Sequence, residues 1–538
     1  MKHFVEVDSR IIGQSTARYN MRRLFKVCFQ RVRLLTALVC GVAVFVAGKS
    51  YSADTAVVDT AIADTAVVVG GGYKLAGSQG QIEKNVKWVQ EVLKQAGVSV
   101  HTYFTDGTDP GVDVHVIDSA TDTRPDLEAL ARVFGDIEGA LTRRHSNTVA
   151  GNLGSTEAGE LLPALSALLS DSEGVPLLVF NGHGGPSPDG RDEVTLKLWE
   201  ETAVSARELH ELLDKDSTDL RYVFTQCYSG GFHRLAYEDS ESGLELADAT
   251  RCGFTAESAW RLAEGCSASI DSADYRDYTT FFFAALSGKT RNNEVLSDVR
   301  DVDADGEISL RDAHLYTLEH AHSTDLSRST SEDFLDQWLP WLDRWLPASA
   351  SLPENEYTEL SRRLASRLGF EKTVPDGKEI REVLQEREQR HQQLQSEASV
   401  IHREVRSIAR ALQKQVFERW PQASSPYTRG FVSLAESGEL QVIDEWLEQQ
   451  TQYTGLRDHQ LRLHELSDLT LEAERDAIQV RKLLRLRRLA RIKGSLYDKG
   501  SEQHIESYER LVACENLPLN TTGFKEVDPL QQVLNSSD

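Results

Sequence analysis

A cysteine and a histidine in this sequence each follow an apolar run and stand at a glycine-rich turn. Cys227 lies in "LRYVFTQCYSGG" (220–231) and His183 lies in "VPLLVFNGHGG" (175–185). An imidazole can take the proton of a thiol and later protonate a leaving amine, so the pair suits nucleophilic attack on a peptide carbonyl. The main-chain N–H groups of Gly184 and Cys227 are candidates for holding the oxyanion. The alternative is a core histidine and a buried cysteine that share strand ends by chance.

The residues around these turns predict the scaffold that positions them. Between residues 65 and 348, apolar bursts alternate with amphipathic stretches, which predicts an α/β domain with a mostly parallel sheet. Reacting groups gather at the carboxyl ends of adjacent parallel strands, and one crossover helix fits between residues 183 and 227, so we expect the two side chains to lie close together. The predicted strands are 65–72, 98–104, 175–185, 220–231 and 252–258, and the predicted helices are 81–97, 156–171, 206–216 and 275–288.

A second stretch within this domain, "DVDADGEISLRD" (301–312), has the spacing of a twelve-residue, EF-hand-like calcium loop. Gly306 supplies the sharp turn at position 6, and an aspartate replaces the usual glutamate at position 12. A shorter carboxylate there can bind through one oxygen, which lowers affinity or favours magnesium. We expect Ca²⁺ in a structural or activating role, the alternative being a solvated acidic turn. The predicted oxygen ligands are Asp301, Asp303, Asp305, Glu307 and Asp312.

The chain changes character near residue 350, and residues 349–538 form a charged helical module. Apolar residues alternate by three and four over 391–412 and again over 466–484, which predicts long coiled-coil-like helices. The linker 421–430 lets the chain turn back, giving an antiparallel hairpin or a bundle closed by a partner. The basic stretch 481–493 is interpreted as a solvated face or an intramolecular partner rather than a membrane or nucleic-acid site. Partner binding and self-inhibition are the expected roles of the module.

Composition narrows the class of partner. The chain has 538 residues, of which 84 are acidic and 59 are lysine or arginine, and its formal net charge is -25. Such a chain is repelled by nucleic acid and by anionic membrane surfaces. We therefore expect no nucleic acid partner, and the thiol and imidazole pair described above leads us to expect a peptide or protein substrate.

The N-terminus has the pattern of an export signal. Residues 1–53 combine a basic start with an uncharged apolar run at 34–47, and small residues follow it. Met21 is an alternative start, and residues 54–64 form a spacer before the first strand. We expect an exported protein, periplasmic or secreted, with no membrane span after removal of the signal. An uncleaved N-terminal anchor is the alternative.

Removal of the signal leaves four cysteines. Cys252 and Cys266 are fourteen residues apart and can close a small disulfide loop in an oxidising compartment. Cys227 then stays free unless it pairs with Cys514. A free thiol in an exported protein is a candidate nucleophile.

The two turns resemble those of the caspase-like cysteine peptidases, and within them the legumain and GPI transamidase family. The resemblance rests on a strand ending in His-Gly and another ending in Cys-x-Ser-Gly, and it covers about residues 60–345. It implies a three-layer sandwich with a six-stranded, mostly parallel sheet, a dyad of His183 and Cys227, and a thioester acyl-enzyme. Gln226 stands where legumains usually have a small residue, so asparagine specificity does not transfer. A pseudo-peptidase scaffold and a transamidase with the same dyad are the alternatives.

The resemblance also suggests substrate-binding residues. In relatives the strand after the cysteine lies beside the substrate, which makes Glu257, Ser258 and Trp260 candidates. An acidic residue there favours a basic side chain on the substrate if it points inward. The alternative is an edge strand with its tryptophan packed in the core.

Overall fold

The computed structural model describes most of the chain between residues 65 and 519. No helix among the described residues is long and apolar enough to cross a membrane. The predicted signal peptide (1–53), Met21, the spacer (54–64) and Cys266 lie outside the described residues. The described ranges are 65–117, 127–135, 142–172, 174–186, 193–238, 243–265, 275–339, 351–371, 375–425 and 427–519.

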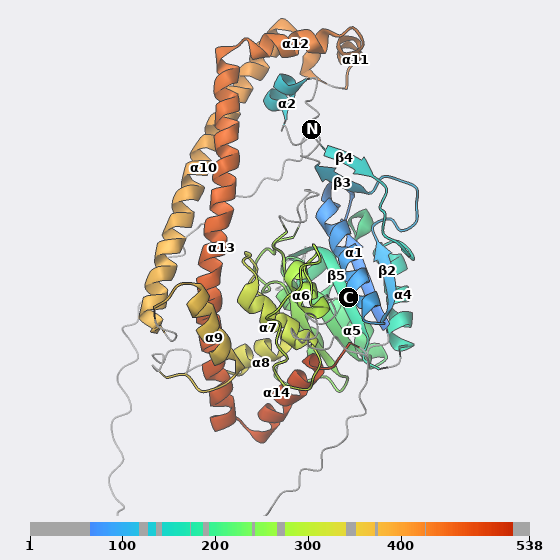
Figure 1. Ribbon diagram of the computed structural model, residues 1–538. Helices are drawn as coiled ribbons and strands as arrows, with labels where there is room; N and C mark the ends of the chain where they lie inside the picture. The colour runs from blue at the N-terminus through green and yellow to red at the C-terminus, as the bar shows by residue number, and fades with distance from the viewer. Residues whose placement is uncertain are drawn as a thin grey trace, which may run out of the picture. The chain divides into compact units, whose positions relative to one another are not determined.

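A central sheet carries the candidate site (Figure 1), and its main path runs in the order β10-β9-β8-β5-β1-β2. All neighbours on this path are parallel except β9 and β10, so the predicted α/β fold with a mostly parallel sheet is confirmed. A hairpin of β6 (Val194–Lys197) and β7 (Ala203–Ser205) continues antiparallel from the far end of β5. The strands of the path are β1 (Thr65–Gly71), β2 (Ser99–Phe104), β5 (Leu177–Pro186), β8 (Leu220–Phe224), β9 (Arg251–Thr255) and β10 (Arg328–Ser329).

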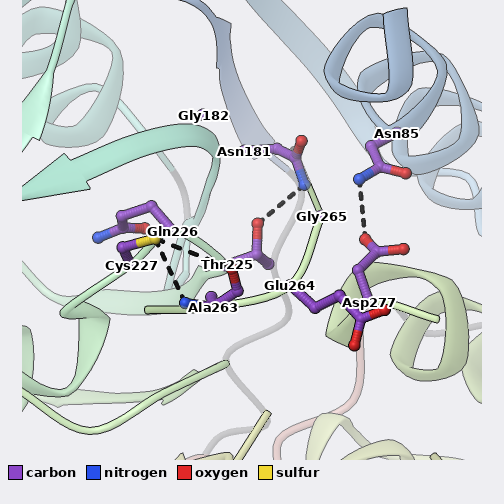
Figure 2. A pocket seen from close by; sticks show the side chains of 10 residues that line it. All are labelled: Asn85, Asn181, Gly182, Thr225, Gln226, Cys227, Ala263, Glu264, Gly265 and Asp277. Atoms are coloured by element: carbon purple, nitrogen blue, oxygen red, sulfur yellow. Dashed lines mark hydrogen bonds between the residues drawn. The ribbon is translucent and has the colours of Figure 1, made fainter. Parts of the chain in front are cut away.

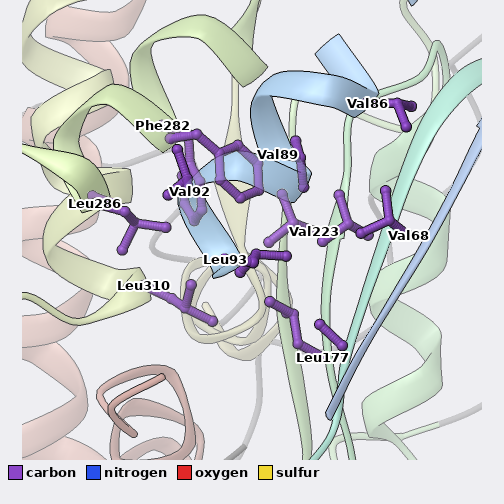
Figure 3. Packing of buried hydrophobic residues seen from close by; sticks show 14 of the residues in the cluster. Val68, Val86, Val89, Val92, Leu93, Leu177, Val223, Phe282, Leu286 and Leu310 are labelled. Atoms are coloured by element: carbon purple, nitrogen blue, oxygen red, sulfur yellow. The ribbon is translucent and has the colours of Figure 1, made fainter. Parts of the chain in front are cut away.

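Helices cover both faces of the sheet because successive strand side chains point to opposite sides. Val68 and Val223 pack in one apolar cluster with α1 (Gly80–Gln95), α6 (Tyr278–Ser287) and α7 (Leu310–His320), as Figure 3 shows. Val67, Val69 and Phe224 pack on the opposite face with α4 (Ala158–Ser170) and α5 (Ala206–Lys215). This gives three layers. A two-stranded sheet of β3 (Val114–Ile117) and β4 (Thr142–His145), and helices α2 (Glu128–Phe134) and α8 (Thr330–Trp338), complete this part of the chain.

The C-terminal region contains two long helices, α10 (Gly377–Arg419) and α13 (Thr451–Lys499), which pack against each other. Glu388 pairs with Arg481, whereas Glu404 pairs with His459, so the two helices are antiparallel as predicted. The predicted seam is interrupted on α13, because Leu469 is 42% exposed. Shorter helices flank or connect the pair: α9 (Glu356–Arg367), α11 (Arg429–Glu436), α12 (Glu439–Glu448) and α14 (Glu502–Glu515).

The basic stretch 481–493 belongs to α13 and pairs within the chain. Arg485 donates to Glu332 of α8 at 2.8 Å, and Lys493 donates to Glu356 of α9 at 2.7 Å. The buried ammonium of Lys482 donates to the Ala321 carbonyl at 2.8 Å. These contacts favour the interpretation as an intramolecular partner.

The predicted Cys252–Cys266 disulfide is wrong, because Cys252 pairs with Cys514 instead. Cys252 is buried on β9, and α14 packs against this strand with Cys514 in its last turn. After β9 the chain continues toward Cys227, where the Ala263 N–H donates to the sulfur. A spacing of fourteen residues permits a small loop but does not require one, and tertiary packing selects the distant partner.

Candidate functional site

His183 and Cys227 occupy equivalent positions on adjacent strands. Phe180 of β5 and Phe224 of β8 are partners in the parallel register, and each functional residue lies three positions further along its strand direction. The two main chains touch at this edge. A Cβ placed on Gly184 meets the Cys227 carbonyl oxygen at 2.2 Å, so only glycine fits beside the cysteine.

The imidazole of His183 is held by groups that follow strand β1. Its Nε2 lies 2.7 Å from the Gly77 carbonyl oxygen and 2.9 Å from Oε1 of Gln79, and its ring meets Tyr73 edge-on at 5.4 Å. Two oxygen acceptors at Nε2 favour the proton on that nitrogen, which leaves the lone pair on Nδ1. Burial lowers the pKa of His183, and the hydrogen bond to the Gly77 carbonyl opposes this by raising the pKa. The positive charge of Lys197 lowers the pKa further. The sequence did not predict a role for Gly77 and Gln79. They reach the histidine only because β1 and β5 are adjacent strands in the sheet.

The thiol of Cys227 is held by the loop after β9. Sγ accepts the Ala263 N–H at 3.3 Å and lies 3.8 Å from the Ala263 carbonyl oxygen. Burial raises the pKa of Cys227, and the negative charges of Asp325 and Glu257 raise it further. Cys227 is a free thiol in the described part of the chain. Both shifts favour a neutral imidazole and a neutral thiol over an imidazolium and a thiolate.

The residue after the cysteine, Tyr228, has a φ of 61°, which is uncommon for a residue with a side chain. Its N–H donates to the Arg261 carbonyl at 2.9 Å, so the loop after β9 holds this turn as well. Such conformations persist where the surroundings impose them, and they cluster at functional sites.

A small polar cavity of about 10 Å³, room for about one water molecule, lies beside the thiol (Figure 2). Two glycines in its wall add no side chain, and six of the other eight lining side chains are amides, carboxylates or hydroxyls. The lining residues are Asn85, Asn181, Gly182, Thr225, Gln226, Cys227, Ala263, Glu264, Gly265 and Asp277.

The predicted substrate residues lie elsewhere. Glu257 is fully buried, and its carboxylate accepts the Arg261 Nε–H at 3.0 Å and the Leu326 N–H at 3.0 Å. The Ser258 hydroxyl is 3.4 Å from the same carboxylate. Trp260 is 73% exposed, so it is not packed in the core either. None of these three predicted residues lines the cavity, and the Glu257 carboxylate is engaged by donors within the protein.

The predicted calcium loop precedes α7. Carboxylate oxygens of Asp301, Asp303 and Asp305 lie within 4.8 Å of one another, and Asp301 Oδ2 accepts the N–H of Gly306 (φ 91°) at 2.7 Å. Converging carboxylates fit a hard cation such as Ca²⁺.

The remaining predicted ligands behave differently. Asp312 is buried and caps α7, accepting both the N–H and the hydroxyl of Ser309, so its side chain does not join the three converging carboxylates. The main-chain N–H of Glu307 donates to Asp305 at 2.8 Å. Asn516, beyond α14, donates to Asp303 at 2.7 Å and connects the C-terminal region to this loop.

Comparison with known proteins adds little to this description. A solved structure that is similar in part is that of the Drosophila initiator caspase Dronc, with 11% sequence identity and a TM-score of 0.23, over 47% of this chain and 77% of that chain. A likeness at this level carries no argument for function. No family model and no curated protein matches the chain. The fold and site define an α/β protein with a histidine and a free cysteine at the carboxyl edge of a mostly parallel sheet.

Proposed function

We propose that this chain is a cysteine endopeptidase in which Cys227 is the nucleophile and His183 the general base. The observation that carries the proposal is the shared position of the two residues, three places beyond paired strand residues on β5 and β8. The contact between Gly184 and the Cys227 carbonyl supports it, because it brings the two turns together.

The proposed reaction starts from the neutral pair. As the sulfur attacks the substrate carbonyl carbon, Nδ1 of His183 takes the thiol proton, and the carbonyl oxygen becomes an oxyanion held by the N–H groups of Gly184 and Cys227. The C–N bond then breaks, the imidazolium gives its proton to the leaving amine, and a thioester remains on Cys227. His183 then takes a proton from water as the water oxygen attacks the thioester carbon. The C–S bond breaks, the carboxylic acid product leaves, and the imidazolium returns the proton to the Cys227 sulfur.

The acceptors at Nε2 have a part in this scheme. The Gly77 carbonyl and the Gln79 amide oxygen stabilise the N–H that stays on the ring, and they favour the positive charge that develops there after proton transfer. They are positioning groups, since they touch neither the substrate nor the sulfur.

The proposal includes export and a calcium ion. A bound Ca²⁺ would be held by Asp301, Asp303 and Asp305 and would balance their charges, fixing the loop before α7. Addition of Ca²⁺ to the wild type should raise its melting temperature, and Asp301→Ala should lose this shift, as differential scanning calorimetry would measure. A wild-type melting curve that Ca²⁺ leaves unchanged would contradict the calcium site.

The decisive experiment uses the chain from residue 54 onward with Ca²⁺ and a diverse peptide library. Wild type should cleave peptides and take up a thiol-directed electrophile at Cys227, whereas Cys227→Ala and His183→Ala should not cleave. His101→Ala, on the outer strand β2, is the matched histidine control and should retain activity. If wild type neither cleaves nor is labelled at Cys227, the chain is a non-catalytic scaffold and the proposal is wrong. Diversion of the product by an added amine would instead identify a transamidase.

A further inference from the structure

We propose that helix α13 positions the nucleophile, with Arg475 as the positioning residue and Glu264 as its partner in the loop that holds the Cys227 thiol. The inference rests on the proposed peptidase function and gives the C-terminal helices a supporting role at that site instead of a self-inhibitory one. It follows from the contacts that join α13 to the loop after β9.

The Cys227 sulfur is held by a main-chain group of this loop. The Ala263 N–H donates to Sγ at 3.3 Å, as a dashed line in Figure 2 shows. Burial raises the pKa of Cys227, and hydrogen bonding with Ala263 opposes this by lowering the pKa. A displacement of Ala263 therefore changes both the place and the acidity of the sulfur.

Two consecutive residues of α13 form ion pairs with the loop on either side of Ala263. Arg475 pairs with both carboxylate oxygens of Glu264, with Nε 3.4 Å from Oε2. Glu474 Oε1 lies 3.5 Å from Arg261 Nη2. The loop offers a cation and then an anion, whereas the helix offers an anion and then a cation. This complementary order favours one register of the loop on α13.

The ion pair of Arg475 and Glu264 is the stronger of these two links. Its side chains are 15% and 16% exposed, so salt screens their attraction less than at an open surface. Glu264 Oε2 also accepts the Thr324 N–H at 2.9 Å, and the Glu264 N–H donates to Asp325 Oδ1 at 2.7 Å. The residue next to Ala263 is thus tied both to α13 and to the segment before β10.

The same face of α13 carries Gln479 and Lys482, four and seven residues after Arg475. Both donate to the Ala321 carbonyl at 2.8 Å. Among the described residues, none from α13 lines the small cavity beside Cys227. The helix thus contacts the loop and not the cavity, as a support does and an inhibitor of the thiol does not.

The test uses the chain from residue 54 onward and measures the reaction and the thiol separately. Arg475→Gln should lower kcat/KM by about tenfold or more, because a displaced sulfur attacks the substrate poorly. The pH profile of Cys227 alkylation by iodoacetamide, followed by peptide mapping, should shift to higher pH, because the Ala263 N–H stabilises the thiolate less. Retained melting temperatures show that the variants are folded. Arg475→Lys keeps the charge without the bidentate geometry and should lie between Arg475→Gln and wild type, so it decides where Arg475→Gln does not fold.

Glu264→Gln separates displacement of the loop from an effect of charge. Removal of the Arg475 charge alone raises the pKa of the thiol, and removal of the Glu264 charge alone lowers it, so charge predicts opposite shifts of the alkylation profile. Displacement predicts a shift to higher pH in both variants. Arg481→Gln is the matched control, because the ion pair of Arg481 is with Glu388 of α10, and it should behave as wild type in both measurements.

The outcomes separate the two proposals. A folded Arg475→Gln that matches wild type in kcat/KM and in alkylation would overturn the positioning role. Opposite shifts in Arg475→Gln and Glu264→Gln would overturn it in favour of a charge effect, and a gain in kcat/KM would overturn it in favour of self-inhibition. If wild type is alkylated at Cys227 but cleaves no peptide, the peptidase proposal fails alone, and the alkylation profiles still decide whether α13 positions the thiol.

Discussion

The disulfide between Cys252 and Cys514 should stabilise the fold by fastening α14 to the sheet. The two cysteines are 262 residues apart, and both are buried. The loss of chain entropy for a loop of this length gives a ceiling of about 5.5 kcal/mol at 25 °C, and measured disulfides typically contribute about 2–4 kcal/mol. We expect Cys252→Ala/Cys514→Ala to lose about 2–4 kcal/mol of unfolding free energy. The variant should still fold, because Glu515 accepts from Arg311 at 2.5 Å and from the Ser331 N–H at 2.7 Å and so holds α14 without the bond.

Guanidinium denaturation followed by circular dichroism measures this difference. A reductant should lower the stability of the wild type to that of the double variant and leave the double variant unchanged. Cys266→Ala is the matched control and should unfold like the wild type. Peptide mapping without reduction should yield a peptide pair joined through Cys252 and Cys514. A Cys252–Cys266 pair, or a double variant as stable as the wild type, would refute the reasoning.

Three further predictions follow from the site and its supports. Gly184→Ala should lower kcat/KM by about 100-fold, because its methyl group displaces the Cys227 carbonyl that it would meet at 2.2 Å; activity within about twofold of wild type would contradict this. Glu515→Ala should cost about 3–5 kcal/mol of unfolding free energy, because it removes the carboxylate that pairs with the buried Arg311 guanidinium. A loss below about 1 kcal/mol in denaturant titration would contradict this prediction. In the pH profile of kcat/KM, the acid limb should lie below the ordinary histidine pKa of 6.5. Burial lowers the pKa of His183, and only its neutral form accepts the thiol proton. An acid limb at or above pH 6.5 would contradict the assignment of His183 as the base.

Local sequence patterns predicted the elements of this fold well. The strand expected at 65–72 is Thr65–Gly71, and the helix expected at 206–216 is Ala206–Lys215. Both follow from the period of apolar residues and from capping, since Ser205 and Glu208 form a capping box at the start of that helix. The placement of His183 and Cys227 at one sheet edge followed from parallel topology alone.

Pairings between distant segments could not be predicted in the same way. Cys252 had a plausible partner fourteen residues away, and only the docking of α14 on β9 selects Cys514.

Glu257 illustrates the same limit at the level of one side chain. Its position after β9 suggested a substrate contact, but the strand pleat turns it toward Arg261, while Glu264, further along the loop, reaches the cavity wall. Which of two nearby carboxylates meets a ligand depends on the direction of each side chain and on the cations packed against it. Here Arg261 keeps Glu257 within the interior, and Arg475 pairs with Glu264 at the edge of the cavity. Since Arg475 comes from α13, the charge at the cavity wall depends on the C-terminal helices as well as on the sheet.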